Sequence, residues 1–243
     1  TLSLVESISS SKIRIIKSRW NDSMKDRGYV YGQQKMISQF NCTGDWAFYV
    51  EGDEVYHENE LEKIKKSMEV NLNDLNVEGL VFDFYHFYGN SNSYIDSPGW
   101  YRNEARIIRN SIRSYAPDGL FWLVLDSNKK GRYPRVKHTG AHCYHYGWIR
   151  SEEQMNLKSK KVKKYWGENH ERIDYSQMDQ SIIKEFKGTH PAIIKKWLSK
   201  DSGIYRVDSS YKLNKKQKKH RLMIQLEKFF GLELSKKHYK LIR

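Results

Sequence analysis

The pattern of apolar and polar residues predicts a series of strands in the first part of the chain. In residues 77–88, large apolar side chains recur at every second position from Leu80 to Phe84, which is the period of a strand. Residues 12–20 carry three isoleucines before a polar turn and predict a strand near the start. Other apolar runs that predict strands cover residues 45–50, 100–109, 119–125 and 141–149.

Helices are expected between these strands. Residues 32–40 predict one helix. Asn59 is the expected N-cap of a second helix, with Glu62 as its capping-box partner. In that second helix, Ile64 and Met68 lie on one face.

The last part of the chain has a different character, because Lys and Glu dominate it and helical spacing returns. The positions with this spacing are Ile182, Ile183 and Phe186, and later Leu222, Leu226 and Phe229. We therefore expect one domain of the α/β class, with a core in residues 1–150 and a helical extension in residues 151–243.

Composition supports a folded protein. The chain has 243 residues, 38% of them hydrophobic and 14% aromatic, which is enough for a substantial core. The two cysteines, Cys42 and Cys143, make neither a disulfide framework nor a zinc site, so reduced thiols are expected. No apolar stretch approaches the roughly 20 residues of a membrane helix, and the first residues lack a secretion signal. We expect a cytoplasmic protein.

The net charge of +14 attracts phosphate-rich partners, whether nucleic acid, nucleotide diphosphates or anionic lipids. Charge alone does not choose among them. The basic run at residues 212–221 is interpreted as a solvated helix face, and contact with an anionic membrane surface or a polyanionic acceptor is its alternative.

The first candidate site is the acidic cluster that follows residues 45–50. Ligands of open α/β sheets bind beyond the carboxyl ends of the strands. The two-residue period places Glu51 and Asp53 on one side and Glu54 on the other. Two carboxylates suit Mg²⁺ or Mn²⁺, which bridges the phosphates of a nucleotide sugar. The alternative is a solvated turn whose acids favour the N-terminus of the next helix.

The run CTGDWAFYVEGDEVYHE, residues 42–58, resembles the segment of family 2 glycosyltransferases in which a tryptophan-containing strand leads into the DxD-type metal motif. Its neighbours resemble one bacterial and viral branch of that family, in the same order over most of the chain: KIRIIKSRWND, GLVFDFYHFYGN, GWYRNEARIIRN, AHCYHYGW and FKGTHPAIIKKW. Two features depart from the family's pattern. Glu51 replaces the first aspartate of the motif, and we expect the chain to start after the family's first strand-helix-strand segment.

The resemblance implies a GT-A-like, Rossmann-related mixed sheet flanked by helices. It implies a hexosyltransferase-like enzyme that moves a sugar, with inversion, from a UDP-, GDP- or dTDP-linked donor to a hydroxyl of a glycan or lipid-linked acceptor. It also implies dependence on Mn²⁺ or Mg²⁺. The expected location is the cytoplasm, with a peripheral position at the membrane as a further expectation.

Inversion needs a carboxylate that takes the proton from the acceptor hydroxyl. By resemblance and position, Glu104 is the candidate for this base, and Asp96 in the preceding loop is the reserve candidate. Arg102 and Arg106 alternate with Glu104 along the strand, so the alternative is a purely structural pairing of Glu104 with its arginines.

Other side chains are assigned by the resemblance and by their chemistry. The family motif favours His145 as a third metal ligand beside Asp53 and Glu51, ahead of His142 and His138; a structural hydrogen bond is the alternative. A lysine can bind a phosphate, and its alternative is a solvated position on a helix. An aromatic ring can stack on a sugar, and its alternative is packing in the core. The candidates are Lys35, Gln34 and Arg102 for the donor, and His86, Trp100 and Tyr101 for the acceptor.

Two alternatives to catalysis stay open. The charge, the seven tryptophans and the seventeen tyrosines suggest a nucleic-acid-binding protein. Nucleic-acid surfaces interleave basic residues with exposed aromatic ones, whereas the aromatic residues here cluster in strands that resemble a core, so no nucleic-acid partner is expected. The second alternative is a degenerate transferase that binds a sugar nucleotide or another protein without turnover.

Overall fold

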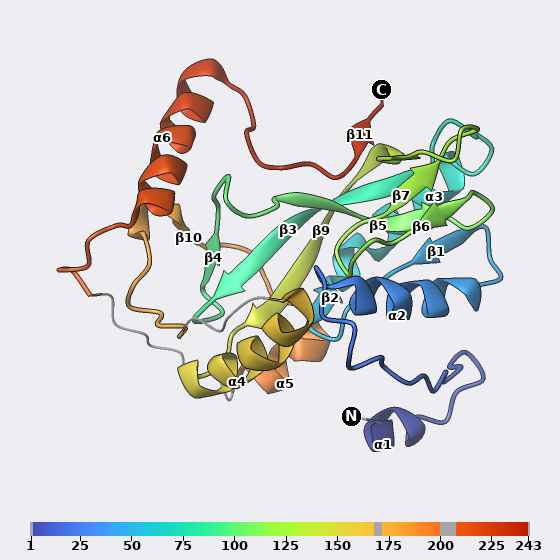
Figure 1. The fold of residues 1–243 in the computed structure, drawn as a ribbon, viewed down its shortest axis with the longest axis horizontal. Coiled ribbons are helices and arrows are strands. Elements are labelled where there is room, and N and C mark those ends of the chain that lie inside the picture. The colour runs from blue at the N-terminus through green and yellow to red at the C-terminus, as the bar shows by residue number, and fades with distance from the viewer. Residues whose placement is uncertain (1, 168–171, 200–207, 243) are drawn as a thin grey trace.

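The computed structural model describes residues 2–167, 172–199 and 208–242. Two long strands, β3 (Gly79–Tyr88) and β9 (Arg135–Trp148), run parallel to each other in the middle of a mixed sheet (Figure 1). Most of β3 is buried, because its alternating apolar side chains meet packed helices or loops on both faces. The α/β class expected from the sequence is confirmed, and so is the strand expected in residues 77–88.

Shorter strands extend the sheet beyond β3. On one side it continues with β5 (Asn103–Arg109) and then β1 (Trp46–Phe48), each antiparallel to its neighbour. The carboxyl half of β3 also pairs with β4 (Ser93–Ile95), which in turn pairs with β10 (Ile183–Glu185). The sequence therefore predicts the position of β5 and β1 well, but it treats the region of β4 as a loop.

Two short strands from distant parts of the chain pair with β9. β2 (Glu54–Tyr56) runs antiparallel to it, and β11 (Lys240–Leu241) runs parallel to it. A separate antiparallel sheet in the described residues is formed by β6 (Ser114–Tyr115), β7 (Leu123–Leu125) and β8 (Gly131–Arg132).

Helices cover both faces of the main sheet. α2 (Tyr29–Phe40) packs through Met36 against a cluster that includes the buried Trp122. α3 (Leu61–Val70) packs through Ile64 against the apolar side of β3. The sheet thus has a hydrophobic core on each face, as a mixed α/β fold requires.

The remaining helices lie at the ends and edges of the sheet. α4 (Glu152–Lys163) follows β9 directly, and α6 (Lys215–Phe230) stands at one edge beside β4 and β10 (Figure 1). The short helices are α1 (Leu2–Glu6), α5 (Lys195–Leu198) and the 3-10 helices η1 (Glu58–Glu60), η2 (Lys164–Trp166), η3 (Gln180–Ile182) and η4 (Ala192–Ile194). Among the described residues, no helix has the length and apolar character needed to cross a membrane.

Two predicted elements are wrong. Residues 12–20 form no strand, because no neighbouring strand in the described part of the chain pairs with them, and Ile13 and Ile15 remain 39% exposed. The spacing at Ile182, Ile183 and Phe186 does not indicate a helix. Instead η3 leads into β10, which gains its hydrogen bonds from β4.

Two predicted helices are correct, but details of them are not. Asn59 does not cap α3: its backbone N–H donates to Nδ1 of His57, which caps η1 at 3.1 Å, and α3 continues from this turn. In α6, Leu222 and Phe229 are exposed, so the apolar spacing does not mark a core face. Both cysteines are free thiols, with Cys42 exposed and Cys143 buried.

Candidate functional site

A pocket of about 310 Å³ lies where the loop between β1 and β2 meets the end of β9 and one side of α4. The loop contributes Glu51 and Asp53, and β9 contributes His145 and Trp148. The structure therefore brings together the three residues that the sequence assigns to a metal. The rest of the wall consists of Met155, Lys158, Ser159, Val162, Lys163, Trp166 and Ile173.

A buried ion pair holds the loop that carries the two carboxylates. Glu54 begins β2, and its carboxylate accepts hydrogen bonds from Nε of Arg106 at 3.0 Å and from Nη2 at 2.5 Å. The same carboxylate accepts from the backbone N–H of Glu51 at 3.1 Å. The turn thus directs Glu54 into the core, while Glu51 and Asp53 line the pocket.

Asp53 interacts with two basic side chains. Its Oδ2 accepts a hydrogen bond of 2.8 Å from Nζ of Lys158, and its Oδ1 lies 3.8 Å from Nε2 of His145. Burial alone would raise the pKa of Asp53, but its positively charged surroundings, with Lys158 in direct hydrogen-bond contact, outweigh it, so the pKa is lowered. Asp53 is therefore a carboxylate anion at neutral pH.

A chain of hydrogen bonds fixes the tautomer of His145. The carbonyl oxygen of Tyr101 can only accept, so Nε2 of His86, 2.8 Å away, carries a hydrogen. Burial holds the pKa of His86 well below its usual value, so the ring is neutral and its Nδ1 is an acceptor. Nδ1 of His145, 3.0 Å from it, must then donate. Burial also lowers the pKa of His145, which leaves its Nε2 unprotonated beside Asp53.

The close approach of His145 to Asp53 depends on the absence of a side chain at position 147. A Cβ on Gly147 would lie 2.6 Å from Nε2 of His145 and 2.7 Å from Oδ2 of Asp53. Both distances are shorter than real contacts of this kind. A larger residue at this position would therefore displace one of the two polar groups.

The pocket offers few protein ligands for an ion. The described residues contain no group of three or more His, Cys, Asp or Glu side chains arranged to hold a metal. However, Mg²⁺ is typically bound by one or two carboxylates together with substrate phosphates and water, and carboxylates also suit Mn²⁺. The carboxylate of Asp53 and the free Nε2 of His145 thus fit an ion that arrives with a diphosphate.

Glu104 lies away from the pocket wall. Its side chain is fully buried, Oε2 is 2.6 Å from Nδ1 of His238, and Oε1 accepts from the backbone N–H of Ala105 at 3.0 Å. Its partner is therefore a histidine near the C-terminal end of the described chain, and not Arg102 or Arg106. A fully buried carboxylate does not meet a bound acceptor in this conformation.

Asp96 and Arg102 form a surface network with α6. Nε of Arg102 lies 2.5 Å from Oδ1 of Asp96, and its Nη1 and Nη2 donate to the two carboxylate oxygens of Glu227 at 2.7 and 3.0 Å. Neither Asp96 nor Arg102 belongs to the wall of the pocket at Asp53. The side chain of Asp96 is 37% exposed, so it is accessible to an acceptor.

The two candidates on α2 also lie outside the pocket wall. Nζ of Lys35 donates to the carbonyl oxygens of Gly119 and Leu120 at 3.3 and 3.2 Å and lies 3.4 Å from the ring centroid of Trp122. Burial lowers the pKa of Lys35 to about 7. Gln34 accepts a hydrogen bond from the hydroxyl of Ser18. The lysine is thus a core residue in this conformation.

The proposed acceptor residues are grouped behind His145. Trp100 packs edge-on against Trp148, with ring centroids 5.2 Å apart, and Trp148 belongs to the pocket wall. The rings of His86 and Tyr101 are 4.6 Å apart in a T-shaped arrangement. These three residues support the wall and do not line it.

His138 and His142 lie away from His145. Strand alternation places residues 142 and 145 on opposite faces of β9. On the face opposite His145, Nε2 of His138 is 3.1 Å from Oδ1 of Asp83, and Nδ1 of His142 is 2.9 Å from Oε1 of Glu60. The period of the strand alone would have separated His145 from the other two.

Sequence reasoning missed the contribution of α4. Its residues Met155, Lys158 and Val162 recur at helical spacing, and all face the pocket. This helix follows the strand that carries His145 after only a short connection, so its amphipathic spacing was the available signal. The contact from Lys158 to Asp53 spans 105 positions and leaves no local signature.

Comparison with known proteins does not assign the chain to a family. No family model matches it, and no curated protein matches it. The resemblance to family 2 glycosyltransferases therefore rests on the motifs of the sequence, and the activity that it implies is a proposal.

Proposed function

We propose that this chain is a GT-A-like glycosyltransferase that binds a nucleotide sugar in the pocket at Asp53. One observation carries the proposal. The carboxylate of Asp53, the unprotonated Nε2 of His145 and the ammonium of Lys158 meet in one pocket. This combination suits a diphosphate with its divalent ion, and the DxD-type motif of the sequence supplies the carboxylate.

Each group in the pocket has a distinct task under this proposal. Asp53 and His145 would hold Mn²⁺ or Mg²⁺, which when bound neutralises the diphosphate leaving group. Lys158 would supply a further positive charge to the phosphates. Trp148 and Trp166 offer aromatic faces to the base or the sugar. The proposed donor is UDP-, GDP- or dTDP-linked, and the proposed acceptor is a glycan or a lipid-linked glycan.

The reaction also needs a proton acceptor. The acceptor hydroxyl attacks the anomeric carbon, the bond to the diphosphate breaks, and a carboxylate takes the hydroxyl proton. Glu104 remains a candidate only if His238 moves away from it. Asp96 is the candidate that we favour, because its carboxylate is exposed while that of Glu104 is fully buried.

A binding protein without turnover is the second candidate function, and the burial of Glu104 against His238 favours it. Binding tests do not separate the two functions, because both predict the same pocket. Release of nucleoside diphosphate from a sugar nucleotide, with and without added acceptor glycans, separates them. Asp96→Asn should abolish this release and retain donor binding if Asp96 is the base.

Thermal unfolding with UDP, GDP and dTDP, each with and without Mn²⁺, tests the binding site. At a ligand concentration one hundred times Kd, binding stabilises the folded state by about 2.7 kcal/mol. For a chain of this size that is a rise in Tm of roughly 5–10 °C. Asp53→Ala should remove the metal-dependent part of this rise, and Asp26→Ala, at an exposed site, is the control. A stabilisation that Asp53→Ala leaves intact would exclude this pocket.

A further inference from the structure

The exposed side of α6 is strongly apolar in its second half. Leu222, Leu226, Phe229 and Phe230 are 56%, 39%, 82% and 61% exposed. The 3.6-residue period places all four on one side of the helix. Four large apolar side chains on one side of a surface helix form a patch of the kind that marks an interaction site.

The opposite side of α6 is fixed to the protein by polar contacts, so the apolar side cannot simply rotate inward. Glu227 accepts from Arg102 at 2.7 and 3.0 Å. One helical turn earlier, Ile224 packs against the cluster around Tyr88. At the start of this side, Arg221 donates to Asp179 at 2.7 and 3.2 Å. These contacts determine which side of the helix faces solvent.

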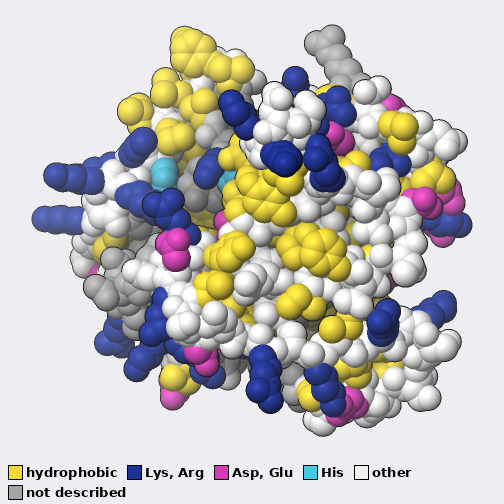
Figure 2. Space-filling model, turned by 45° about the vertical axis from the view of Figure 1, so that its right-hand side comes forward, with side chains coloured by type: hydrophobic (Ala, Val, Ile, Leu, Met, Phe, Trp, Pro, Cys, Tyr) yellow, Lys and Arg dark blue, Asp and Glu magenta, His cyan; other side chains and the backbone are white. Residues whose placement is uncertain are grey.

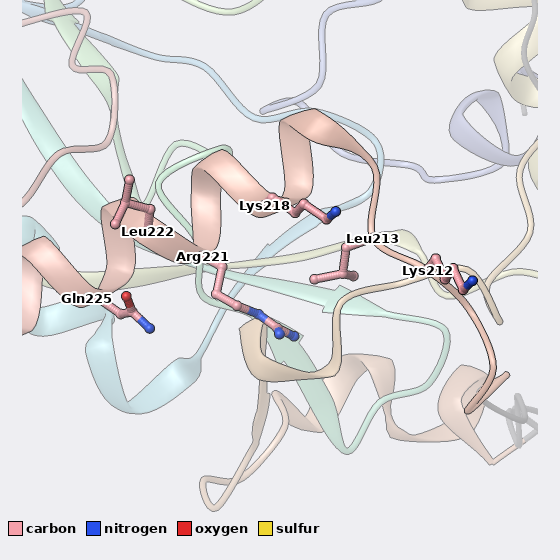
Figure 3. Close-up of a pocket in the computed structure, with 6 residues that line it drawn as sticks. All are labelled: Lys212, Leu213, Lys218, Arg221, Leu222 and Gln225. Atoms are coloured by element: carbon pink, nitrogen blue, oxygen red, sulfur yellow. The ribbon is translucent and has the colours of Figure 1, made fainter.

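The first half of the same exposed side is basic. Lys215, Lys218 and Lys219 are exposed and follow the same period as the apolar residues. A shallow pocket of about 420 Å³ lies beside them (Figure 3). Its walls come from α6 and the segment before it and consist of Lys212, Leu213, Lys218, Arg221, Leu222 and Gln225.

We propose that α6 docks the protein on an anionic lipid bilayer. The apolar stripe of Leu222, Leu226, Phe229 and Phe230 lies in the boundary between headgroups and acyl chains, and the lysines of the first half contact the lipid phosphates. An amphipathic helix with Phe and Leu on one side and Lys close by has the composition of an interfacial helix. The pocket beside Lys218 accommodates a headgroup.

The apolar stripe and the positive charge together select an anionic bilayer over other occupants of this surface. The chain has a net charge of +14, and Lys and Arg clearly outnumber Asp and Glu on the face drawn in Figure 2. The acidic side chain of α6, Glu227, is on the inward side and is paired with Arg102. Nothing on the exposed side of the helix therefore opposes an anionic surface. This inference does not depend on the proposed transferase activity.

Co-sedimentation with vesicles tests the proposal. We expect binding to vesicles of equal parts phosphatidylcholine and phosphatidylglycerol, weak binding to phosphatidylcholine alone, and loss of affinity at high salt. The double variant Phe229→Ser with Phe230→Ser should bind at least about tenfold more weakly, because it removes two inserted rings. Lys218→Glu with Lys219→Glu should weaken binding at least about twentyfold, since each lysine contributes about fivefold.

Matched variants elsewhere on the surface provide the controls. Phe40→Ser alters an apolar side chain of α2 that is 77% exposed, and Lys65→Glu with Lys66→Glu alters two exposed lysines of α3. Both should bind vesicles like the wild type, and circular dichroism should show that all variants are folded. Equal binding by the α6 variants and the controls would overturn the proposal. The proposal would also be overturned if the wild type did not bind vesicles but formed a dimer that the variant Phe229→Ser with Phe230→Ser dissociates.

Discussion

Lys158 in α4 donates a hydrogen bond of 2.8 Å to Oδ2 of Asp53, across 105 positions of the chain. A cation of the protein therefore already neutralises the carboxylate that is proposed to bind a divalent ion. Under this proposal the two cations would compete for Asp53 when no phosphate is present. With a diphosphate in the pocket they would act together, because the phosphates carry enough negative charge for both.

This relationship predicts opposite effects of Lys158→Met on two ligands. Mn²⁺ alone should bind more tightly to the variant, because a repelling charge is removed. A nucleoside diphosphate with Mn²⁺ should bind about ten to a hundred times more weakly, because a charged hydrogen bond contributes roughly 1.5–3 kcal/mol. Isothermal titration calorimetry measures both affinities, with Lys65→Met as the control. If the variant kept its affinity for the nucleotide, Lys158 would have no role at the phosphates.

Gly147 provides a test of the site geometry. Gly147→Ala should reduce metal-dependent nucleotide binding at least about tenfold, because its Cβ would lie 2.6 Å from Nε2 of His145. Overpacking of this kind costs about 1–3 kcal/mol of unfolding free energy. Gly52→Ala is the matched control from the loop of Asp53, because a Cβ there has no neighbour within 4 Å. Thermal shift with nucleotide and Mn²⁺ compares the two variants, and equal behaviour would argue against the site.

His86 should act through His145. His86→Phe keeps an aromatic ring but leaves the Nδ1–H of His145 and the carbonyl of Tyr101 without their partner. Loss of a partner behind a metal ligand typically costs ten- to a hundredfold in metal affinity. We therefore expect this loss in Mn²⁺-dependent nucleotide binding and about 1–3 kcal/mol less stability. A stability loss with unchanged nucleotide affinity would reduce His86 to a structural role.

Lys35 predicts a stability that rises with pH. Its pKa is lowered to about 7 by burial in the folded protein, against an ordinary value of about 10.4 in the unfolded chain. Between these values the unfolded chain holds a proton that the folded protein lacks, so stability increases with pH from about 7 to about 10.4, by at most about 1.4 kcal/mol per pH unit. Urea unfolding of wild type and Lys35→Met across this range isolates the effect. The free energy of unfolding of the variant should rise less steeply with pH than that of the wild type, and identical pH dependences would refute the prediction.

Much of the sheet could be predicted from local pattern, because buried strands such as β3 alternate or cluster their apolar residues. The failures have physical causes. The isoleucines of residues 12–20 have strand propensity, but a strand also needs a partner, which propensity does not reveal. In α6 the spacing of Leu222 and Phe229 correctly predicts a helix. It does not predict that polar contacts such as Glu227 with Arg102 hold the other side against the protein.

The candidate site shows the same limit. The acidic turn with Asp53 is recognisable because its neighbours in sequence carry the resemblance. Lys158 is not recognisable in this way, since it reaches Asp53 only through the tertiary fold. Likewise, the alternation of residues in β5 suggests that Glu104 pairs with its arginines, whereas the fold supplies His238 from 134 positions away.

The pairing of Glu104 with His238 has a consequence for biosynthesis. The carboxylate is fully buried in β5, and its partner is made 134 residues later. Burial of an ionised carboxylate without a partner is strongly unfavourable. While the ribosome is still translating the segment before residue 238, the nascent sheet therefore lacks the group that allows β5 to be enclosed. The native sheet should be completed only after that segment has left the exit tunnel.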